Sequence, residues 1–313
     1  MKSKKISFLI AAHNEEKLIA KTLENLTNIP YANYEVIIVL DGCTDNTENI
    51  VKKYTQTNKN FKYFSLNLRK GKPAVINKII EKSKGEIIII NDADWIFTVK
   101  DKKTLQEFIS IFDDPKIGGI AESFPVEWDL KKSKKVNGGH LAVAYATKFW
   151  MDYLKQKYST KEGNISKVAN SQKFLTNIFL KKHYKSNTTL GDDFERTSDI
   201  LNSGSKVIFF NDIKFPRMIA SYTTISFRDL FKQKVRTALA RKQLNKKYSK
   251  KTFNNSDFIK GIYYILINSL KTGPKITILV VLWILITSSS ALFSIIKVAD
   301  TKSAWKLRAR RQN

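Results

Sequence analysis

The run Ile87-Ile88-Ile89-Ile90-Asn91-Asp92-Ala93-Asp94 decides the fold of this 313-residue chain. Four consecutive isoleucines are typical of a short β-strand that is buried on both faces, as in a parallel sheet. Asp92 and Asp94 follow this strand directly, where a parallel sheet presents its ligand-binding edge. Two carboxylates one residue apart can face one hard cation, Mg²⁺ or Mn²⁺, and an acidic turn is the simpler alternative.

Similar buried-strand patterns precede this run at Ile6–Ala12, 36–40 and Phe61–Leu66. Segments with helical periodicity lie between the strands, over residues 15–28, 47–57 and 73–84. This alternation predicts an α/β fold, a mostly parallel sheet with helices on both faces. Asn14 and Asp45 are expected to be helix N-caps.

The pattern after Asp94 is less regular. Helices are expected over residues 102–112, 139–155, 192–201 and 226–245, and extended chain over residues 117–126.

Polar residues follow each of the first three strands as well. Asn14 and Glu15 come after the first, Asp41 after the second, and Arg69-Lys70-Gly71-Lys72 after the third. Because the carboxyl ends of parallel strands share one edge, these residues are expected to form one site of mixed charge. The basic segment offers cations to a diphosphate, and Gly71 permits close backbone approach; a solvated loop is the alternative.

Four segments resemble, in order, the motifs of glycosyltransferase family 2: residues 6–16 (ISFLIAAHNEE), 39–47 (VLDGCTDNT), 69–77 (RKGKPAVIN) and 92–94 (DAD). The resemblance implies a Rossmann-like GT-A fold and an inverting, metal-dependent enzyme with a nucleotide-sugar donor, a UDP- or GDP-sugar. The residues expected at the donor are Ala12, Asn14, Glu15, Asp41, Arg69, Lys72 and Asp92, with the metal on Asp92 and Asp94. Leu40 stands where the family often has another acid, which leaves the base of the nucleotide open.

The second half resembles the family more loosely. In residues 191–195 (GDDFE), Asp192 takes the glutamate position of the family's Glu-Asp segment. Asp193 is expected to be the general base that deprotonates an acceptor hydroxyl, and a helix N-cap is the alternative.

Residues 233–236 (QKVR) resemble the QxxRW segment of processive members, so Arg236 is a candidate to neutralise the leaving diphosphate. Thr237 replaces the tryptophan, which argues against a long-polymer synthase. An ordinary amphipathic helix explains this segment equally well.

The composition points to polyanionic neighbours. Lys and Arg total 55 against 28 Asp and Glu, a net charge of +27. No nucleic-acid-binding motif accompanies these charges, so no nucleic acid is expected as a partner, and a membrane-tethered nucleic-acid binder is the non-enzymatic alternative. The lone Cys43 excludes an internal disulfide. A sugar nucleotidyltransferase would need a glycine-rich loop, which residues 11–14 lack.

Residues 276–296 carry no charge, and a helix of this length covers roughly 31 Å, enough for a bilayer core of about 30 Å. The expected organisation is a catalytic domain (1–254) and a membrane region (255–313). The latter would hold an interfacial helix (258–270), a transmembrane helix (276–296) and a basic tail (297–313).

The expected location is the membrane, with the catalytic domain facing the cytoplasm and a lipid-linked or glycan acceptor. A polyprenyl-phosphate acceptor would need no general base. A single span would export the basic tail against the positive-inside bias, and a hairpin at Gly273-Pro274 is the alternative that keeps it in the cytosol.

Overall fold

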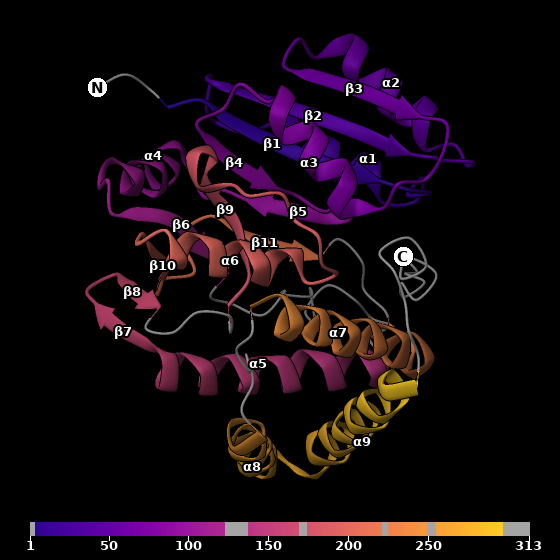
Figure 1. Ribbon diagram of the computed structural model, residues 1–313, viewed down its shortest axis with the longest axis vertical. Coiled ribbons are helices and arrows are strands. Elements are labelled where there is room, and N and C mark those ends of the chain that lie inside the picture. The colour runs from indigo at the N-terminus through magenta and orange to yellow at the C-terminus, as the bar shows by residue number, and fades with distance from the viewer. Residues whose placement is uncertain (1–3, 123–136, 169–173, 221–224, 249–254, 297–313) are drawn as a thin grey trace. The chain divides into compact units, whose positions relative to one another are not determined.

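The computed structural model describes residues 4–122, 137–168, 174–220, 225–248 and 255–296 (Figure 1). The chain forms two compact units. We call residues 1–122, 160–188 and 192–221 the sheet unit, and residues 123–159, 189–191 and 222–313 the helical unit. The helical unit includes residues before and after residue 254. The expected division into a catalytic domain (1–254) and a membrane region (255–313) therefore stays a prediction.

The sheet unit is built on a nine-stranded sheet in the order β3-β2-β1-β4-β9-β6-β10-β8-β7. Its strands are β1 (Ile6–Ala12), β2 (Tyr34–Asp41), β3 (Phe61–Leu66), β4 (Ile87–Ile90), β6 (Ile117–Ala121), β7 (Ser159–Glu162), β8 (Ile165–Val168), β9 (Thr176–Leu180) and β10 (Lys206–Phe210). A separate antiparallel pair joins β5 (Trp95–Thr98) to β11 (Arg217–Ala220).

Strand direction decides where the polar strand ends lie. β1 pairs in parallel with β2 and β4, and β2 pairs in parallel with β3. β9 is antiparallel to both β4 and β6, so β6 runs in the same direction as β4. The carboxyl ends of β1, β2, β3, β4 and β6 therefore share one edge with the beginning of β9. The mostly parallel α/β architecture is confirmed, and the antiparallel β9 was not expected.

The helices of the sheet unit are α1 (Ile19–Thr27), α2 (Thr47–Thr57), α3 (Lys72–Lys82), α4 (Lys102–Ser110) and α6 (Asp192–Asn202), with short 3₁₀ turns at Ile111–Asp113 and Lys181–His183. α1 and α4 pack against alternate residues of β1 in one hydrophobic core. In this core the rings of Phe8 on β1 and Phe97 on β5 meet edge to face. α3 contacts β1 and β2, whose Leu9 and Ile37 lie outside that core, so helices cover both sheet faces.

Both N-cap predictions are wrong. The residue that precedes α1 is Leu18, and Asn14 lies four residues earlier with a φ of 55°. Asn46 precedes α2, while the Asp45 carboxylate accepts a hydrogen bond from the Thr47 amide at 3.0 Å. Both polar side chains tie loops together at the sheet edge.

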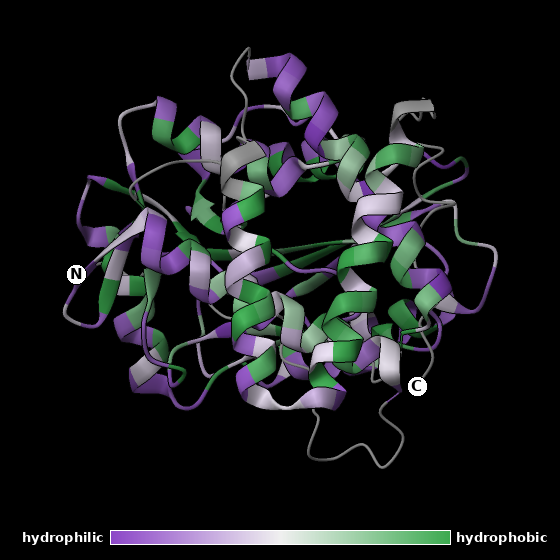
Figure 2. Ribbon diagram, turned by 90° about the horizontal axis from the view of Figure 1, so that it is seen from below, coloured by the Kyte–Doolittle hydropathy of each residue, from purple (hydrophilic) through white to green (hydrophobic). Residues whose placement is uncertain are grey.

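The helical unit consists of α5 (Gly138–Tyr158), α7 (Phe227–Tyr248), α8 (Asn255–Thr272) and α9 (Pro274–Ile296). α9 packs against the other three helices, and Gly273, with a φ of 129°, makes the turn between α8 and α9. Within α9, Pro274–Ser294 is long and apolar enough to cross a membrane. In Figure 2 much of the length of α8 and α9 is hydrophobic. The predicted basic tail lies outside the described residues.

Candidate active site

Two groups of residues meet the carboxyl edge of the sheet. We call residues 12–16, 41–47 and 69–71 the strand-end loops. We call six ionisable residues the charge cluster: Lys72, Glu122, Asp92, Asp192, Asp193 and Arg196. All belong to the sheet unit.

The first two strand-end loops are fastened to each other by side chains. The Asn14 amide oxygen accepts a hydrogen bond from the Thr44 backbone amide at 2.8 Å, and its NH₂ donates to the Thr44 hydroxyl at 3.0 Å. The Glu15 amide donates to the Thr47 hydroxyl at 2.8 Å. Asn14 adopts the left-handed backbone, which asparagine tolerates better than most residues. These bonds fix Asn14 and Glu15, which follow Ala12 at the end of β1, to the loop after β2.

Asp41 fastens the third strand-end loop. Its carboxylate is fully buried and accepts hydrogen bonds from the backbone amides of Lys70 at 2.6 Å and Gly71 at 2.8 Å. Gly42 lies so close that a Cβ there would stand 2.9 Å from the Arg69 nitrogen. The observed partners of Asp41 thus hold the Arg69-Lys70-Gly71 segment against the sheet. Contact with the base or ribose stays a prediction.

The Asp92-Ala93-Asp94 segment is held by backbone carbonyls. The Thr22 hydroxyl on α1 donates to the Ala93 carbonyl at 2.9 Å and lies 3.1 Å from the Trp95 carbonyl. Asp94 is completely buried, whereas Asp92 is partly exposed and forms an ion pair with Lys72 at 2.6 Å. The sequence therefore brings one buried and one solvent-accessible carboxylate to the end of β4.

Lys72, at the start of α3, lies among acids. Burial opposes its charge, but Asp92 and Asp192 outweigh that effect and raise the pKa of Lys72. Burial also disfavours the charged form of Asp192, yet Lys72 and Arg196 more than compensate and lower its pKa. The buried Arg196 guanidinium bonds the Asp192 carboxylate at 2.7 Å. These three residues are therefore charged together at neutral pH.

Asp193 differs from its neighbour. Burial and the charge on Asp192 raise the pKa of Asp193, which makes it a better proton acceptor than an ordinary aspartate. Asp193 lies in the first turn of α6, which begins at Asp192, so the N-cap alternative does not describe it. Its carboxylate accepts a hydrogen bond from the next amide, that of Phe194, at 2.9 Å.

The sequence did not single out Arg196, Asn177 or Glu122. Arg196 donates to the Thr176 carbonyl at 2.9 Å and to the Asn177 side-chain oxygen at 2.5 Å, and Asn177 donates to Glu122 at 2.7 Å. Burial raises the pKa of Glu122 to about 7, with Asp193 and Asp92 adding to it. The i, i+4 spacing of Asp192 and Arg196 was a signal for this ion pair. Glu122 has no such signal, because the fold alone brings it here.

Asn77, at the end of the RKGKPAVIN segment, supports the approach to α6. Its NH₂ donates to the Asn187 carbonyl at 3.0 Å, and its oxygen accepts from the Asn187 amide at 3.0 Å and from the Tyr184 hydroxyl. α3 thus holds the segment that leads to Asp192 and Asp193.

Asp92 and Asp94 are the residues that could hold a divalent ion, with waters and substrate phosphates as its other ligands. The described residues contain no group of three or more His, Cys, Asp or Glu side chains placed to hold a metal. Asp92 and Asp94 supply carboxylate oxygens, and Mg²⁺ commonly binds one or two carboxylates together with waters and substrate phosphates. Arg236 lies on α7 in the helical unit, so its role at a diphosphate stays a prediction.

Comparisons with known proteins agree with these observations. The family model described as glycosyl transferase family 2 matches residues 7–175, more than half of the chain. Poly-beta-1,6-N-acetyl-D-glucosamine synthase of Staphylococcus epidermidis is 30% identical over 115 residues, 37% of this chain and 27% of that protein. The synthase of Staphylococcus aureus strain COL is 33% identical over 116 residues, again 37% of this chain and 27% of that protein. The matched region thus spans about a quarter of these relatives.

A solved structure extends the likeness to nearly the whole chain. The mannosyltransferase of Pyrobaculum calidifontis in complex with GDP-Man and Mn²⁺ has a TM-score of 0.55 at 16% identity, over 98% of this chain and 79% of that one. At this identity the likeness concerns the fold, and the predicted GT-A-type fold is confirmed.

Proposed function

Because the chain belongs to glycosyl transferase family 2 and is therefore a glycosyltransferase, we propose that it moves a sugar from a nucleotide-diphosphate donor to a lipid-linked or glycan acceptor at the cytoplasmic face of a membrane. Because the chain belongs to this family, we favour this function over the two alternatives, a sugar nucleotidyltransferase and a membrane-tethered nucleic-acid binder. One observation carries the proposal. A single edge of the sheet unit holds a cationic segment, two carboxylates suited to a metal, and an aspartate of raised pKa.

The strand-end loops supply the donor site. Asn14 and Glu15 would line the nucleoside site. Arg69 and Lys72 would be the two cations that face the diphosphate. Lys72 is held by Asp92 at 2.6 Å, so an incoming diphosphate would exchange one anionic partner of Lys72 for another. Asp92 and Asp94 would hold Mg²⁺ or Mn²⁺, which offsets the negative charge of the departing nucleoside diphosphate.

Asp193 supplies the base for a hydroxyl acceptor. The acceptor oxygen forms a bond to the anomeric carbon from the side opposite the diphosphate, whose bond to that carbon breaks. The hydroxyl proton passes to the Asp193 carboxylate. Burial and Asp192 favour protonation of Asp193, and Arg196 neutralises Asp192 beside it. A polyprenyl-phosphate acceptor would bypass this step, because its oxygen is already anionic.

The names of the similar proteins suggest the first donors to test. UDP-GlcNAc and GDP-Man, with other nucleotide sugars, should be screened for thermal stabilisation of the full chain and for hydrolysis, each with and without Mn²⁺ or Mg²⁺. We expect one nucleotide sugar to raise the melting temperature only when a divalent ion is present. Stabilisation by none of them would refute the donor proposal.

A further inference from the structure

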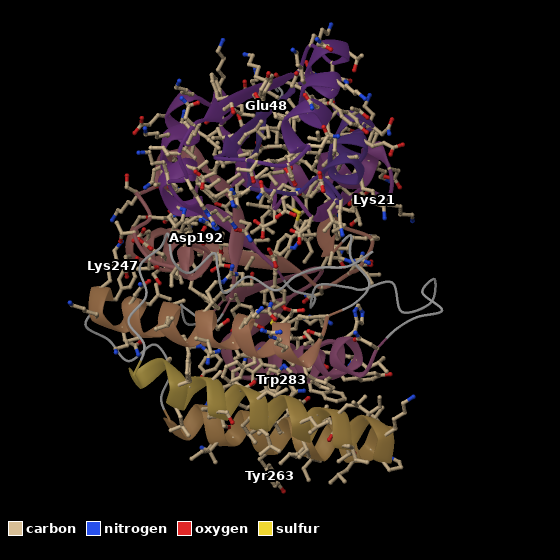
Figure 3. All side chains as sticks on the ribbon, turned by 90° about the vertical axis from the view of Figure 1, so that its right-hand side faces the viewer. Lys21, Glu48, Asp192, Lys247, Tyr263 and Trp283 are labelled. Atoms are coloured by element: carbon tan, nitrogen blue, oxygen red, sulfur yellow. The ribbon has the colours of Figure 1, made fainter. Side chains whose placement is uncertain are left out.

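The outer face of α8 and α9 is apolar. Ile259 and Tyr263 on α8, and Ile278, Leu285 and Leu292 on α9, are all more than half exposed, Leu285 at 57% and Leu292 at 67%. Figure 3 shows Tyr263 pointing away from the helical unit. A face of this kind on two adjacent helices normally binds a protein or a membrane.

The opposite side of α9 belongs to the interior of the helical unit. Val280, Trp283, Ser290 and Ser294 are buried and recur at intervals of three, seven and four residues, as on one helix face. Trp283 points toward the other helices in Figure 3. α9 is thus two-sided, with one side packed on protein and the other side apolar and exposed. A helix that is surrounded by lipid is expected to be apolar and exposed on all sides.

A basic helix accompanies α9. The Lys234 ammonium of α7 lies 4.2 Å from the centre of the Trp283 ring, and the Phe231 ring lies 5.9 Å from that of Phe293. Both contacts come from a single turn of α7, and Trp283 lies near the middle of the apolar stretch Pro274–Ser294 of α9. If α9 crossed a bilayer, this turn of α7, with Lys234, would lie at the depth of the hydrocarbon. Charged side chains are costly there.

α8 packs closely against α5. Gly261 meets Trp150 so closely that a Cβ would stand 2.2 Å from the indole ring. The Gln156 amide donates to the Tyr264 hydroxyl at 2.9 Å. The two helices α8 and α9 therefore form an integral layer of the helical unit.

We propose that the α8–α9 hairpin lies in the plane of the membrane, with its apolar face in the outer acyl region of an anionic bilayer, and that α9 does not cross it. This inference rests on the membrane association proposed above. Lys260, Lys271 and Lys275 are exposed on the hairpin, where they can reach lipid phosphates, and the net charge of +27 favours an anionic surface. The basic tail then stays on the same side as the catalytic residues, which agrees with the positive-inside bias.

The sidedness of the two chain ends tests this arrangement. The full chain, tagged at both ends, is expressed in cells, and sealed inside-out membrane vesicles are treated with protease. An in-plane hairpin predicts that both tags are cleaved, and that Lys271→Cys, placed beside the turn in a Cys43→Ser chain, reacts with a membrane-impermeant maleimide added outside these vesicles. A membrane-crossing hairpin would also leave both tags cleaved but would hide this cysteine, and that result would overturn the proposal. Cleavage of the N-terminal tag with protection of the C-terminal tag would overturn the proposal in favour of a spanning α9.

The contact face is tested with purified full chain and sealed phosphatidylcholine vesicles with or without phosphatidylglycerol. Flotation should increase with the anionic lipid, and Leu285→Glu or Leu292→Glu should weaken vesicle binding at least about tenfold. The matched control is Ile213→Glu, which charges an apolar side chain of the sheet unit that is 49% exposed, and it should bind as the unaltered chain does. Because all three side chains are exposed, the melting temperature should stay close to that of the unaltered chain.

The other outcomes are equally decisive. If the unaltered chain fails to float, or the Leu285→Glu variant floats as well as Ile213→Glu, the face is not a membrane face, and a second copy or another protein covers it. Donor-induced thermal stabilisation, measured without vesicles, separates this failure from that of the proposed function. Leu285→Glu should retain that stabilisation, whereas an unaltered chain that binds vesicles but no nucleotide sugar would refute only the enzymatic proposal.

Discussion

The strand-end loops and the charge cluster share one edge of the sheet, yet different forces hold them. Backbone amides and hydroxyls fasten the strand-end loops, as in the two amides on the Asp41 carboxylate and the Thr44 contacts of Asn14. Opposite charges hold the charge cluster, in the pairs Lys72–Asp92 and Arg196–Asp192. The first arrangement rests on hydrogen bonds to backbone amides and hydroxyls. The second can rearrange when a new anion or cation arrives.

This difference suits the tasks proposed for the two regions. Loops that are already tied together can bind a nucleoside with little further loss of conformational entropy. A diphosphate and a metal bring large charges, and Lys72 and Asp92 can exchange each other for these new partners. The comparison predicts that removing the charge of Asp193 impairs turnover more than stability, and that removing the Asp41 carboxylate impairs stability more than turnover.

The largest effect is expected from Asp94→Asn, at the carboxylate that lies two residues from Asp92 of the charge cluster. The variant keeps the shape of a buried side chain but removes its charge, and we expect kcat to fall about 10³-fold, as for other lost electrostatic contacts in active sites. Turnover at saturating donor and Mn²⁺ measures the effect. Asp114→Asn, at an exposed position, is the control. Near-normal turnover in Asp94→Asn would show that the metal assignment is wrong.

Asp193→Asn identifies the acceptor class. Loss of a general base costs about 10²–10⁴-fold, so a hydroxyl acceptor predicts a fall in kcat of that size with little change in donor affinity. A phosphate acceptor predicts nearly unchanged turnover. Parallel assays with a glycan and with a polyprenyl phosphate give the answer, and a loss of donor affinity in the variant would contradict the proposed role.

Asp41→Ala should act mainly on stability. It leaves the buried amides of Lys70 and Gly71 without their charged acceptor, which is expected to lower the free energy of unfolding by about 3 kcal/mol. Urea unfolding measures this change. The loosened loop should also raise the KM for the donor more than it lowers kcat. An unchanged unfolding free energy would contradict the comparison.

Glu122→Gln should show a pH-dependent effect on stability. The pKa of Glu122 in the fold is about 7, above that of an unfolded glutamate, so the folded state binds the proton more tightly. Ionisation of Glu122 therefore destabilises the fold progressively as pH rises from about 4.5 to about 7, and the penalty is complete above that range. Glu122→Gln should stabilise the chain by about 2 kcal/mol at pH 8 and not at pH 4.

This measurement should be made in EDTA, because a bound cation would itself favour the ionised form. Glu107→Gln, at an exposed position of α4, is the matched control and should show no such difference between the two pH values. A pH-independent gain in Glu122→Gln would mean that folding does not raise the pKa of Glu122.

The sequence predicted the first half of the sheet unit well. β1, β3, β4 and α2 begin and end at the expected residues, because a buried strand next to an amphipathic helix is a local pattern. β9 was missed, since its five residues are antiparallel in a parallel setting and their burial depends on β4 and β6. The helix over 276–296 was expected as well, but its packed side against α7 was not.

By itself the sequence determined which polar residues stand at the sheet edge, because strand period and strand ends are properties of a few consecutive residues. Only the tertiary structure decided what those residues contact. Asp41 receives amides from the loop after the neighbouring strand, and Arg196 joins Asp192 to Asn177 and, through it, Glu122. Hydrogen bonds and pKa values depend on distance and burial, which segments far apart in the chain create only when they pack together.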